Sequence, residues 1–244
     1  MKHFIVGASG GIGLALVGRS IAHGNQVTAL TRQASPKLLE LRQSAPRQLA
    51  IIEGDLLTDT AETQSKLNGL FRRFGKPDWT INAAGILHHG QSMPEKKLDD
   101  VTPDSFQRNL EANTYLSIAL AQYLATGYQR ADPFRFICLS ALVGSISDNR
   151  TGGWYSYRMS KAALNMFVKT LSHEWRRQYP NAIVAAIHPG TTATDLSAPF
   201  WANIADGKLF SPSLTAERLL TLIATIPNTG SGQFFHWDGT QISW

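Results

Sequence analysis

A tyrosine and a lysine in the segment Y-S-Y-R-M-S-K (155–161) have the types and the spacing for proton transfer. Tyr157 and Lys161 are four residues apart, so they share a face if the segment is helical, whereas Tyr155 lies nearly on the opposite side. A nearby ammonium group favours phenolate and lowers the tyrosine pKa from about 10. Such a phenol can donate a proton to a carbonyl oxygen or accept one from an alcohol. A half-buried tyrosine beside a surface lysine is the alternative interpretation of the same spacing.

A serine hydroxyl near this tyrosine would belong to the same chemistry, and the preceding segment L-S-A-L-V-G-S-I-S (139–147) offers several. The segment follows the apolar run R-F-I-C-L, which predicts a strand that ends close to the first serine. A hydroxyl at such a strand end can form part of a proton-transfer site. The candidates are Ser140, Ser145 and Ser147.

Strand-like and helix-like segments alternate along the chain, with no internal repeat and no low-complexity linker. The alternation predicts one Rossmann-like α/β domain over 1–244, a doubly wound, mostly parallel sheet of about seven strands with helices on both faces. The expected strands are His3–Val6, Gln26–Thr31, Ala50–Glu53, Trp79–Asn82, Phe134–Leu139, Ile183–His188 and Gln233–His236. The helical patterns lie near 12–22, 36–44, 59–74, 103–126, 156–178 and 213–225.

A glycine-rich turn joins the first expected strand to the first expected helix. The segment F-I-V-G-A-S-G-G-I-G places Gly7, Gly11 and Gly13 in the spacing G-x-x-x-G-x-G. Glycine lets the backbone turn sharply and approach a ligand, and the helix N-terminus presents free N–H groups to a phosphate. Ser9 could add a hydroxyl donor. Because the glycines stand in a strand–turn–helix context, the segment predicts a dinucleotide site.

The end of the second expected strand indicates which dinucleotide binds. NAD sites usually place an acid there, on the ribose 2′-OH. No Asp or Glu occurs between Gly13 and Glu40, and the strand end reads L-T-R, with Arg32. A guanidinium at this position can bind the 2′-phosphate of NADP bidentately. The alternative is an exposed arginine at the start of a loop.

The chain as a whole resembles the short-chain dehydrogenase/reductase family over nearly its full length. The motifs that carry the resemblance are G-A-S-G-G-I-G (7–13), G-D-L (54–56), N-A-A-G (82–85), E-A-N-T (111–114), Y-R-M-S-K (157–161) and H-P-G-T-T-A-T-D (188–195). The segment S-I-S-D-N-R-T-G-G-W-Y-S-Y-R-M-S-K and the ending G-Q-F-F-H-W-D-G-T-Q-I-S-W are similar to the C-factor and sniffer-like carbonyl reductase branch.

The resemblance implies roles at matching positions. Tyr157 would be the catalytic acid/base, Lys161 would hold the nicotinamide ribose and lower the tyrosine pKa, and Asn113 would support a proton-relay water. A lid-like segment near 195–212 would cover the substrate. With Arg32 added from the strand end, the expected NADP(H)-binding residues are Gly7, Ser9, Gly11, Ile12, Gly13, Arg32, Asp55, Leu56, Asn82, Ala83, Ala84, Gly85, Tyr157, Lys161, Pro189, Gly190, Thr192 and Thr194.

One position departs from the family pattern. The family has S-S-x-x-G or G-S-x-x-G here, and the second residue of the motif polarises the substrate carbonyl; counting back from Gly144 places Ala141 there. Ser140 is the candidate substitute, although its side chain would point the other way in an extended strand. Loss of one oxyanion donor typically costs about 10²–10³ in rate.

The composition narrows the classes of function. With 43% hydrophobic and 17% charged residues, disorder is not expected, and the net charge of +5 suits a phosphorylated ligand without forming a nucleic-acid patch. The single cysteine, Cys138, lies in an apolar run and cannot form an internal disulfide. No signal-peptide core or membrane span is expected, so the chain is interpreted as cytoplasmic, without a nucleic-acid, membrane or metal partner.

The leading hypothesis is therefore an NADP-dependent short-chain dehydrogenase/reductase of the EC 1.1.1 class. It would transfer hydride between the nicotinamide and a carbonyl or secondary alcohol. The resemblance also implies a homodimer or homotetramer paired through helices 103–126 and 156–178, although these could face only the sheet. The rival hypothesis, motivated by Ala141, is an NADP-binding sensor or signalling protein with weak or no catalysis. A dehydratase or epimerase is a third possibility.

Overall fold

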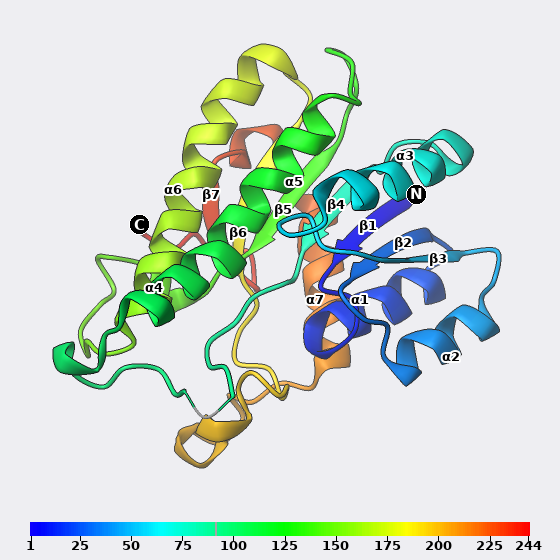
Figure 1. Ribbon diagram of the computed structural model, residues 1–244. Helices are drawn as coiled ribbons and strands as arrows, with labels where there is room; N and C mark the ends of the chain where they lie inside the picture. Colours follow the sequence, from blue (N-terminus) through cyan, green and yellow to red (C-terminus); the bar gives the residue numbers. More distant parts are fainter. Residues whose placement is uncertain (91) are drawn as a thin grey trace.

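A seven-stranded parallel sheet forms the centre of the computed structural model, which describes residues 1–90 and 92–244 (Figure 1). The strand order is β3-β2-β1-β4-β5-β6-β7, and every pair of neighbours is parallel. The predicted doubly wound α/β fold is confirmed. The strands are β1 Lys2–Val6, β2 Gln26–Thr31, β3 Leu49–Glu53, β4 Trp79–Asn82, β5 Arg135–Leu139, β6 Ile183–His188 and β7 Gln233–His236. The helices are α1 Gly11–Ala22, α2 Pro36–Ser44, α3 Thr60–Phe74, α4 Pro103–Leu110, α5 Leu116–Ala125, α6 Tyr155–Gln178 and α7 Pro212–Thr225.

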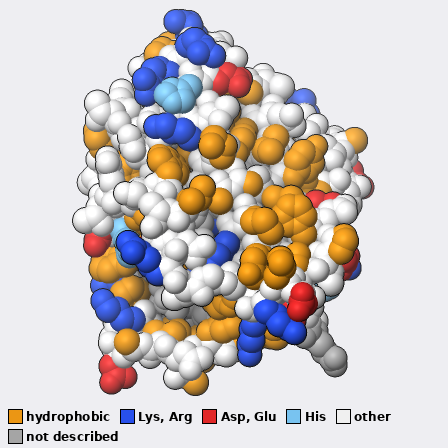
Figure 2. Space-filling view, turned by 90° about the vertical axis from the view of Figure 1, so that its left-hand side faces the viewer, with side chains coloured by type: hydrophobic (Ala, Val, Ile, Leu, Met, Phe, Trp, Pro, Cys, Tyr) orange, Lys and Arg blue, Asp and Glu red, His pale blue; other side chains and the backbone are white. Residues whose placement is uncertain are grey.

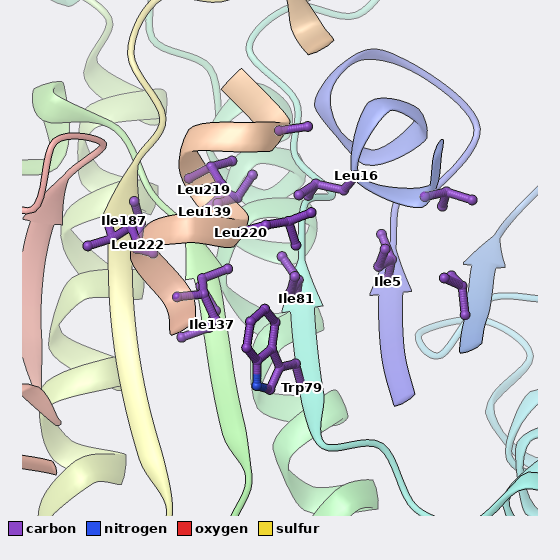
Figure 3. Close-up of a cluster of buried hydrophobic side chains, with 14 of the residues drawn as sticks. Ile5, Leu16, Trp79, Ile81, Ile137, Leu139, Ile187, Leu219, Leu220 and Leu222 are labelled. Atoms are coloured by element: carbon purple, nitrogen blue, oxygen red, sulfur yellow. The ribbon is translucent and has the colours of Figure 1, made fainter. Parts of the chain in front are cut away.

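Each face of the sheet is covered by its own hydrophobic layer, because alternate residues of a strand point to opposite faces. In β5, Ile137 and Leu139 pack with α1 and α7, whereas Phe136 and Cys138 pack with α3, α5 and α6. Figure 3 shows the first layer, where side chains such as Ile81 and Leu220 from the strands and α7 meet in one buried cluster. Burial on both faces explains why the strands read as continuous apolar runs rather than as alternating ones.

The predicted helix 103–126 is not continuous. It begins at Pro103, with Thr102 as its N-cap, and it is interrupted by a π-helical turn at Glu111–Tyr115 before α5 continues. The turn contains Asn113, whose amide bonds to the main chain of Ile86 in another loop. This tertiary contact is absent from any local pattern, so the pattern predicted one helix.

The strand order reverses between β1 and β4, since β2 continues from β1 on one side and β5 from β4 on the other. In open α/β sheets the crevice at the carboxyl ends of the strands on either side of such a reversal is where ligands bind. The glycine turn follows β1 and the N-A-A-G segment follows β4, so both motifs lie at this crevice. Within 1–90 and 92–244, no helix combines the length and the apolar character that crossing a bilayer requires.

Candidate active site

Tyr157 and Lys161 both lie in the first two turns of α6 and are both buried, with 8% and 4% of their surface exposed. The Lys161 ammonium donates a hydrogen bond of 3.0 Å to the Leu139 carbonyl at the end of β5. Its Nζ lies 5.8 Å from the centre of the Tyr157 ring. The helical spacing expected from the sequence therefore places the two side chains together, at the carboxyl end of the sheet.

Burial controls the protonation of this pair. It raises the pKa of Tyr157 well above the usual value for a phenol, and it lowers the pKa of Lys161 to about 8. The expected lowering of the tyrosine pKa by the lysine is therefore not found in this structure, because loss of hydration disfavours phenolate. Tyr157 is held as a phenol, which is a proton donor, and most of Lys161 is charged at neutral pH.

Asn113 joins the π-helical turn to the loop after β4 and to α6. Its Nδ2 donates to the Ile86 carbonyl at 2.9 Å and to the Ser160 hydroxyl at 2.9 Å, while its Oδ1 accepts from the Ile86 N–H at 2.8 Å. A Cβ on Gly85 would lie 2.9 Å from Asn113 Oδ1 and 3.4 Å from Lys161 Nζ. The fourth residue of N-A-A-G thus lies directly against both side chains.

Ala141 lies in extended backbone at the start of the short 3-10 turn Leu142–Gly144. Gly144 fixes the register of this loop, because a Cβ there would lie 2.8 Å from Lys161 Cβ. The glycine therefore packs directly on α6 beside the lysine. Ala141, three positions before Gly144, carries a methyl group, whereas the family motif it resembles has a serine hydroxyl.

The three serines of the segment 139–147 all have partners other than Tyr157. Ser140 donates its hydroxyl to Asn165 Oδ1 at 2.7 Å, on the α6 side of the sheet. Ser145 donates to the Ser243 carbonyl at 2.6 Å, and Ser147 is hydrogen-bonded to Ser145 at 3.3 Å. Among the described residues, none of these hydroxyls is hydrogen-bonded to Tyr157, and Ser140 is directed away from the position of Ala141.

The glycine turn after β1 is packed too closely for side chains at two of its glycines, and it leads into a helix N-terminus without a side-chain cap. Gly7 has φ of 78°, and a Cβ there would lie 2.7 Å from the Ala84 nitrogen. A Cβ on Gly13 would lie 2.1 Å from the Gly7 carbonyl oxygen. The N-cap of α1 is Gly10, without a side-chain cap and without an acid in the first turn, so the helix N-terminus offers its N–H groups to an anion. These features fit a dinucleotide.

We expect Gly13→Ala to destabilise the fold by about 1–3 kcal/mol, because its methyl group overlaps the Gly7 carbonyl. Gly10→Ala is the matched control, since nothing lies within 4 Å of a Cβ at Gly10 and its φ of −156° is extended. Thermal unfolding without cofactor measures both. Equal melting temperatures for the two variants would show that the backbone around Gly13 has room for a methyl group.

The end of β2 has an acidic neighbour that the sequence did not predict, the Glu53 carboxylate from β3. Arg32 is exposed there, and no described acidic side chain pairs with it. Ser9 donates its hydroxyl to the Gln33 carbonyl, so it braces the glycine turn against the loop after β2. Glu53, at the end of β3, accepts from the Ala34 N–H at 2.7 Å. Sequence reasoning missed this acid because it comes from the next strand, and only the parallel register of β2 with β3 places it here.

The other expected cofactor-contacting residues stabilise the loops around the crevice. Asn82 accepts from the Ala84 N–H at 3.1 Å and donates to Ser117 at 2.8 Å. Asp55 accepts from the Leu57 N–H at 2.8 Å. Six further residues that were expected to bind NADP(H) are held by packing or by bonds to the main chain: Ile12, Leu56, Ala83, Pro189, Gly190 and Thr192.

The loop after β6 reaches the glycine turn and carries the segment expected to form a lid. A Cβ on Gly11 would lie 3.1 Å from Thr194 Cγ2, so these two motifs meet. Main-chain hydrogen bonds of 2.8 Å join Phe210 to Thr191 and Ala193 and close the base of the segment. Its middle forms the 3-10 turn Ala198–Asn203.

Comparison with known proteins agrees with this arrangement. A family model described as short chain dehydrogenase matches residues 2–205, which include the glycine turn, the N-A-A-G segment, the tyrosine–lysine pair and the loop after β6. The chain belongs to the short-chain dehydrogenase family. The C-signal protein of Myxococcus xanthus is 30% identical over 170 residues, which cover 70% of this chain and 94% of that protein.

Solved structures share the fold of this short-chain dehydrogenase. The carbonyl reductase Sniffer of D. melanogaster superposes with a TM-score of 0.83 at 23% identity, covering 100% of this chain and 99% of that one. An NADPH-bound carbonyl reductase from chicken fatty liver gives a TM-score of 0.85 at 23% identity, covering 100% and 94%. At these identities the likeness establishes the fold, and residue roles rest on the site itself.

Proposed function

We propose that this short-chain dehydrogenase is an NADP-dependent reductase that converts a carbonyl compound to a secondary or primary alcohol, with Tyr157 as the proton donor. The observation that carries the proposal is the buried tyrosine–lysine pair, whose lysine is bonded to the Leu139 carbonyl at the carboxyl end of β5. Relatives of similar fold include an NADPH-bound carbonyl reductase, which supports the choice of cofactor.

The crevice would hold NADP(H) between the loops after β1, β4 and β6. The N-terminus of α1 and the turn Gly7–Gly13 would take the pyrophosphate, Arg32 the 2′-phosphate, and Asp55 with Leu56 the adenine side. Segment 82–85 and residues 189–194 would line the rest, with Lys161 on the nicotinamide ribose. When bound, NADPH supplies the hydride that reduces the carbonyl carbon.

Tyr157 would protonate the carbonyl oxygen as negative charge develops on it. Burial raises the pKa of Tyr157, so the phenol keeps its proton at neutral pH, and the positive charge of Lys161 is needed to make it an effective acid. The Lys161 ammonium, held by the Leu139 carbonyl, would stabilise the phenolate left after proton transfer. Asn113, fixed by four hydrogen bonds to its side chain, would support the water that returns the proton.

Ala141 supports a second candidate function, an NADP-binding protein with weak or no catalysis. No described serine hydroxyl replaces the missing donor, because Ser140 is bonded to Asn165. One experiment separates the reductase from the NADP-binding protein. Purified protein is mixed with NADPH and a broad panel of aldehydes and ketones, and oxidation is followed by the absorbance of the reduced nicotinamide. Tight NADPH binding without turnover on any member of the panel favours the binding protein.

The preference for NADPH over NADH is expected to depend on Arg32. We expect Arg32→Ala to weaken NADPH binding by about tenfold to a hundredfold, because a bidentate charge-assisted contact with the 2′-phosphate is lost, and to leave NADH binding unchanged. Arg176→Ala, which removes an exposed arginine from the last turn of α6, is the control. Fluorescence titration measures both affinities. An equal loss for NADH and NADPH would remove Arg32 from the 2′-phosphate site.

The face formed by α6 and the π-helical turn is proposed as the surface of a homodimer or homotetramer. Met166 of α6 is 67% exposed, and Tyr115 and Met159 are also exposed. Figure 2 looks onto the side of the molecule where α4 and α6 lie, and hydrophobic side chains gather near its middle. We expect Met166→Glu to shift the protein toward monomer in sedimentation velocity. A parent protein that sediments as a monomer would contradict this assignment.

The proposal also includes the interpretation of 1–244 as one domain with a lid near 195–212, and a cytoplasmic location. Limited proteolysis with and without NADPH tests the lid, since bound cofactor is expected to protect residues 195–212 while the rest of the chain stays resistant.

A further inference from the structure

Trp154 stands immediately before the first turn of α6 in a conformation that bulky residues avoid. Its φ and ψ are 51° and 43°, and the two preceding residues, Gly152 and Gly153, also have positive φ of 63° and 67°. Left-handed backbone is rare in non-glycine residues and persists only where the surroundings impose it. Of the non-glycine residues in 1–90 and 92–244, Trp154 is the one with positive φ.

The left-handed turn directs the Trp154 indole toward the candidate active site. The indole packs edge to face against Tyr157, with ring centres 6.2 Å apart. It also packs at a tilt against Phe200 of the 3-10 turn Ala198–Asn203, with ring centres 4.8 Å apart and ring planes at 51°. The three rings come from α6, the residue before it and the segment expected to cover the substrate. None of these three aromatic side chains carries a charge, so together they form an apolar surface.

Glu95 holds this turn in place from a separate loop. Its main-chain carbonyl accepts from the Trp154 N–H at 2.6 Å. Its carboxylate accepts from the Ser156 hydroxyl, from the Ser156 N–H at 3.2 Å and from the Ser105 hydroxyl at 2.9 Å. The side chain thus closes the first turns of α4 and α6 together, where helix dipoles favour a negative charge.

The Glu95 carboxylate is buried, and its hydrogen-bond donors are the hydroxyl groups of Ser105 and Ser156 and the Ser156 N–H. Only 5% of the residue is exposed, and no described cation lies within salt-bridge distance of it. Burial alone would raise the pKa of this carboxyl, but the hydrogen bonds from Ser156 and Ser105 outweigh it and lower the pKa. A buried carboxylate with three donors is costly to place and fixes the groups around it.

We propose that Trp154 is a specificity-determining residue, the wall against which the group attached to the reacting carbonyl packs, and that Glu95 is the positioning residue that keeps it there. The inference rests on the proposed function for the role of Tyr157. It implies a flat, apolar substituent on the carbonyl, because stacked and edge-to-face contacts with aromatic rings favour planar groups. Glu95 acts only through Trp154 and the start of α6.

The test compares an aromatic ketone, acetophenone, with a small one, acetone. Trp154→Gly removes the ring without backbone strain, since glycine tolerates φ of 51°, and Trp154→Phe keeps an aromatic wall. We expect Trp154→Gly to lower kcat/KM for acetophenone, through KM, by about tenfold more than for acetone, with Trp154→Phe in between. An equal change for both ketones overturns the specificity role.

A second readout needs no turnover. Calorimetric titration of acetophenone into the protein loaded with NADP⁺, which cannot reduce the ketone, is expected to give about tenfold weaker binding to Trp154→Gly than to the parent. Equal affinities overturn the inference whatever the kinetics. If NADPH reduces no aldehyde or ketone of the panel but acetophenone binding still depends on Trp154, the proposed function fails while the role of Trp154 in binding holds.

Glu95→Ala is expected to reproduce the pattern of Trp154→Gly, and the double variant Glu95→Ala/Trp154→Gly to bind acetophenone no more weakly than Trp154→Gly alone. Glu95→Gln keeps an acceptor for the two serine hydroxyls, so we expect it to recover part of the affinity and to carry the test if Glu95→Ala does not fold. Additive losses in the double variant, or a loss of stability with unchanged acetophenone binding, overturn the positioning role.

Discussion

Tyr157→Phe is expected to lower the turnover of a reducible carbonyl compound by about 10²–10⁴, the contribution of a positioned general acid. The substitution removes only the hydroxyl. The ring keeps its edge-to-face contact with Trp154, so neither the fold nor the crevice for NADPH should change. Steady-state kinetics with NADPH, together with a fluorescence titration of the cofactor, measures both effects. The expected combination is lost turnover with unchanged NADPH binding.

Tyr155→Phe is the matched control, because it also removes one phenol hydroxyl. Tyr155 is the first residue of α6 and lies six residues before Lys161, nearly on the other side of the helix. We expect its turnover to equal that of the parent. If Tyr157→Phe keeps full activity, or if both variants lose it equally, Tyr157 is not the proton donor of this site.

Ala141→Ser is expected to raise turnover by on the order of 10²-fold, because it supplies a donor to the oxygen on which charge develops. Ala141 has φ of −146° and ψ of 147°, which any residue adopts, and its side chain is partly exposed. One added oxygen therefore introduces neither strain nor burial. The rate is measured under saturating NADPH, and NADPH affinity is expected to stay as in the parent.

Ser140→Ala separates the two possible sources of this hydroxyl. The Ser140 hydroxyl is bonded to Asn165, so its removal should cost about 1 kcal/mol of stability and leave the rate unchanged. Loss of turnover in Ser140→Ala would make Ser140 the donor after all. A parent without turnover that gains it only with Ala141→Ser would identify the native chain as a cofactor-binding protein.

Much of the fold follows from local pattern because parallel strands are buried on both faces and stand out as apolar runs. The strand at Trp79–Asn82 lies where it was expected, and the bounds of the strand at Arg135–Leu139 differ by one residue. The N-cap Thr102, which accepts from the Ser105 N–H, and Gly24 after α1, with φ of 78°, are likewise set by residues close in sequence. These features depend on neighbours in sequence, which is why they could be predicted.

The remaining features depend on contacts between distant segments. The π-helical turn carries Asn113, which bonds to the main chain of Ile86, and the hydroxyl of Ser140 bonds to Asn165. Glu95 lies in a loop with no periodic pattern, yet the structure places it against Ser156. The sequence motifs predicted the positions of the tyrosine, the lysine and the glycine turn. The contacts that hold these groups in place could be seen only in the structure.

The central claim is that a hydride passes from NADPH to the carbon of a carbonyl group in this site. The direct test uses NADPH carrying deuterium at the transferable position of its nicotinamide, with acetophenone as the carbonyl compound, and mass spectrometry of the product. The account predicts an alcohol that carries one deuterium on its carbinol carbon, at a rate that Tyr157→Phe suppresses. Deuterium retained entirely on the cofactor, with no alcohol formed from this or any other carbonyl compound, would contradict it.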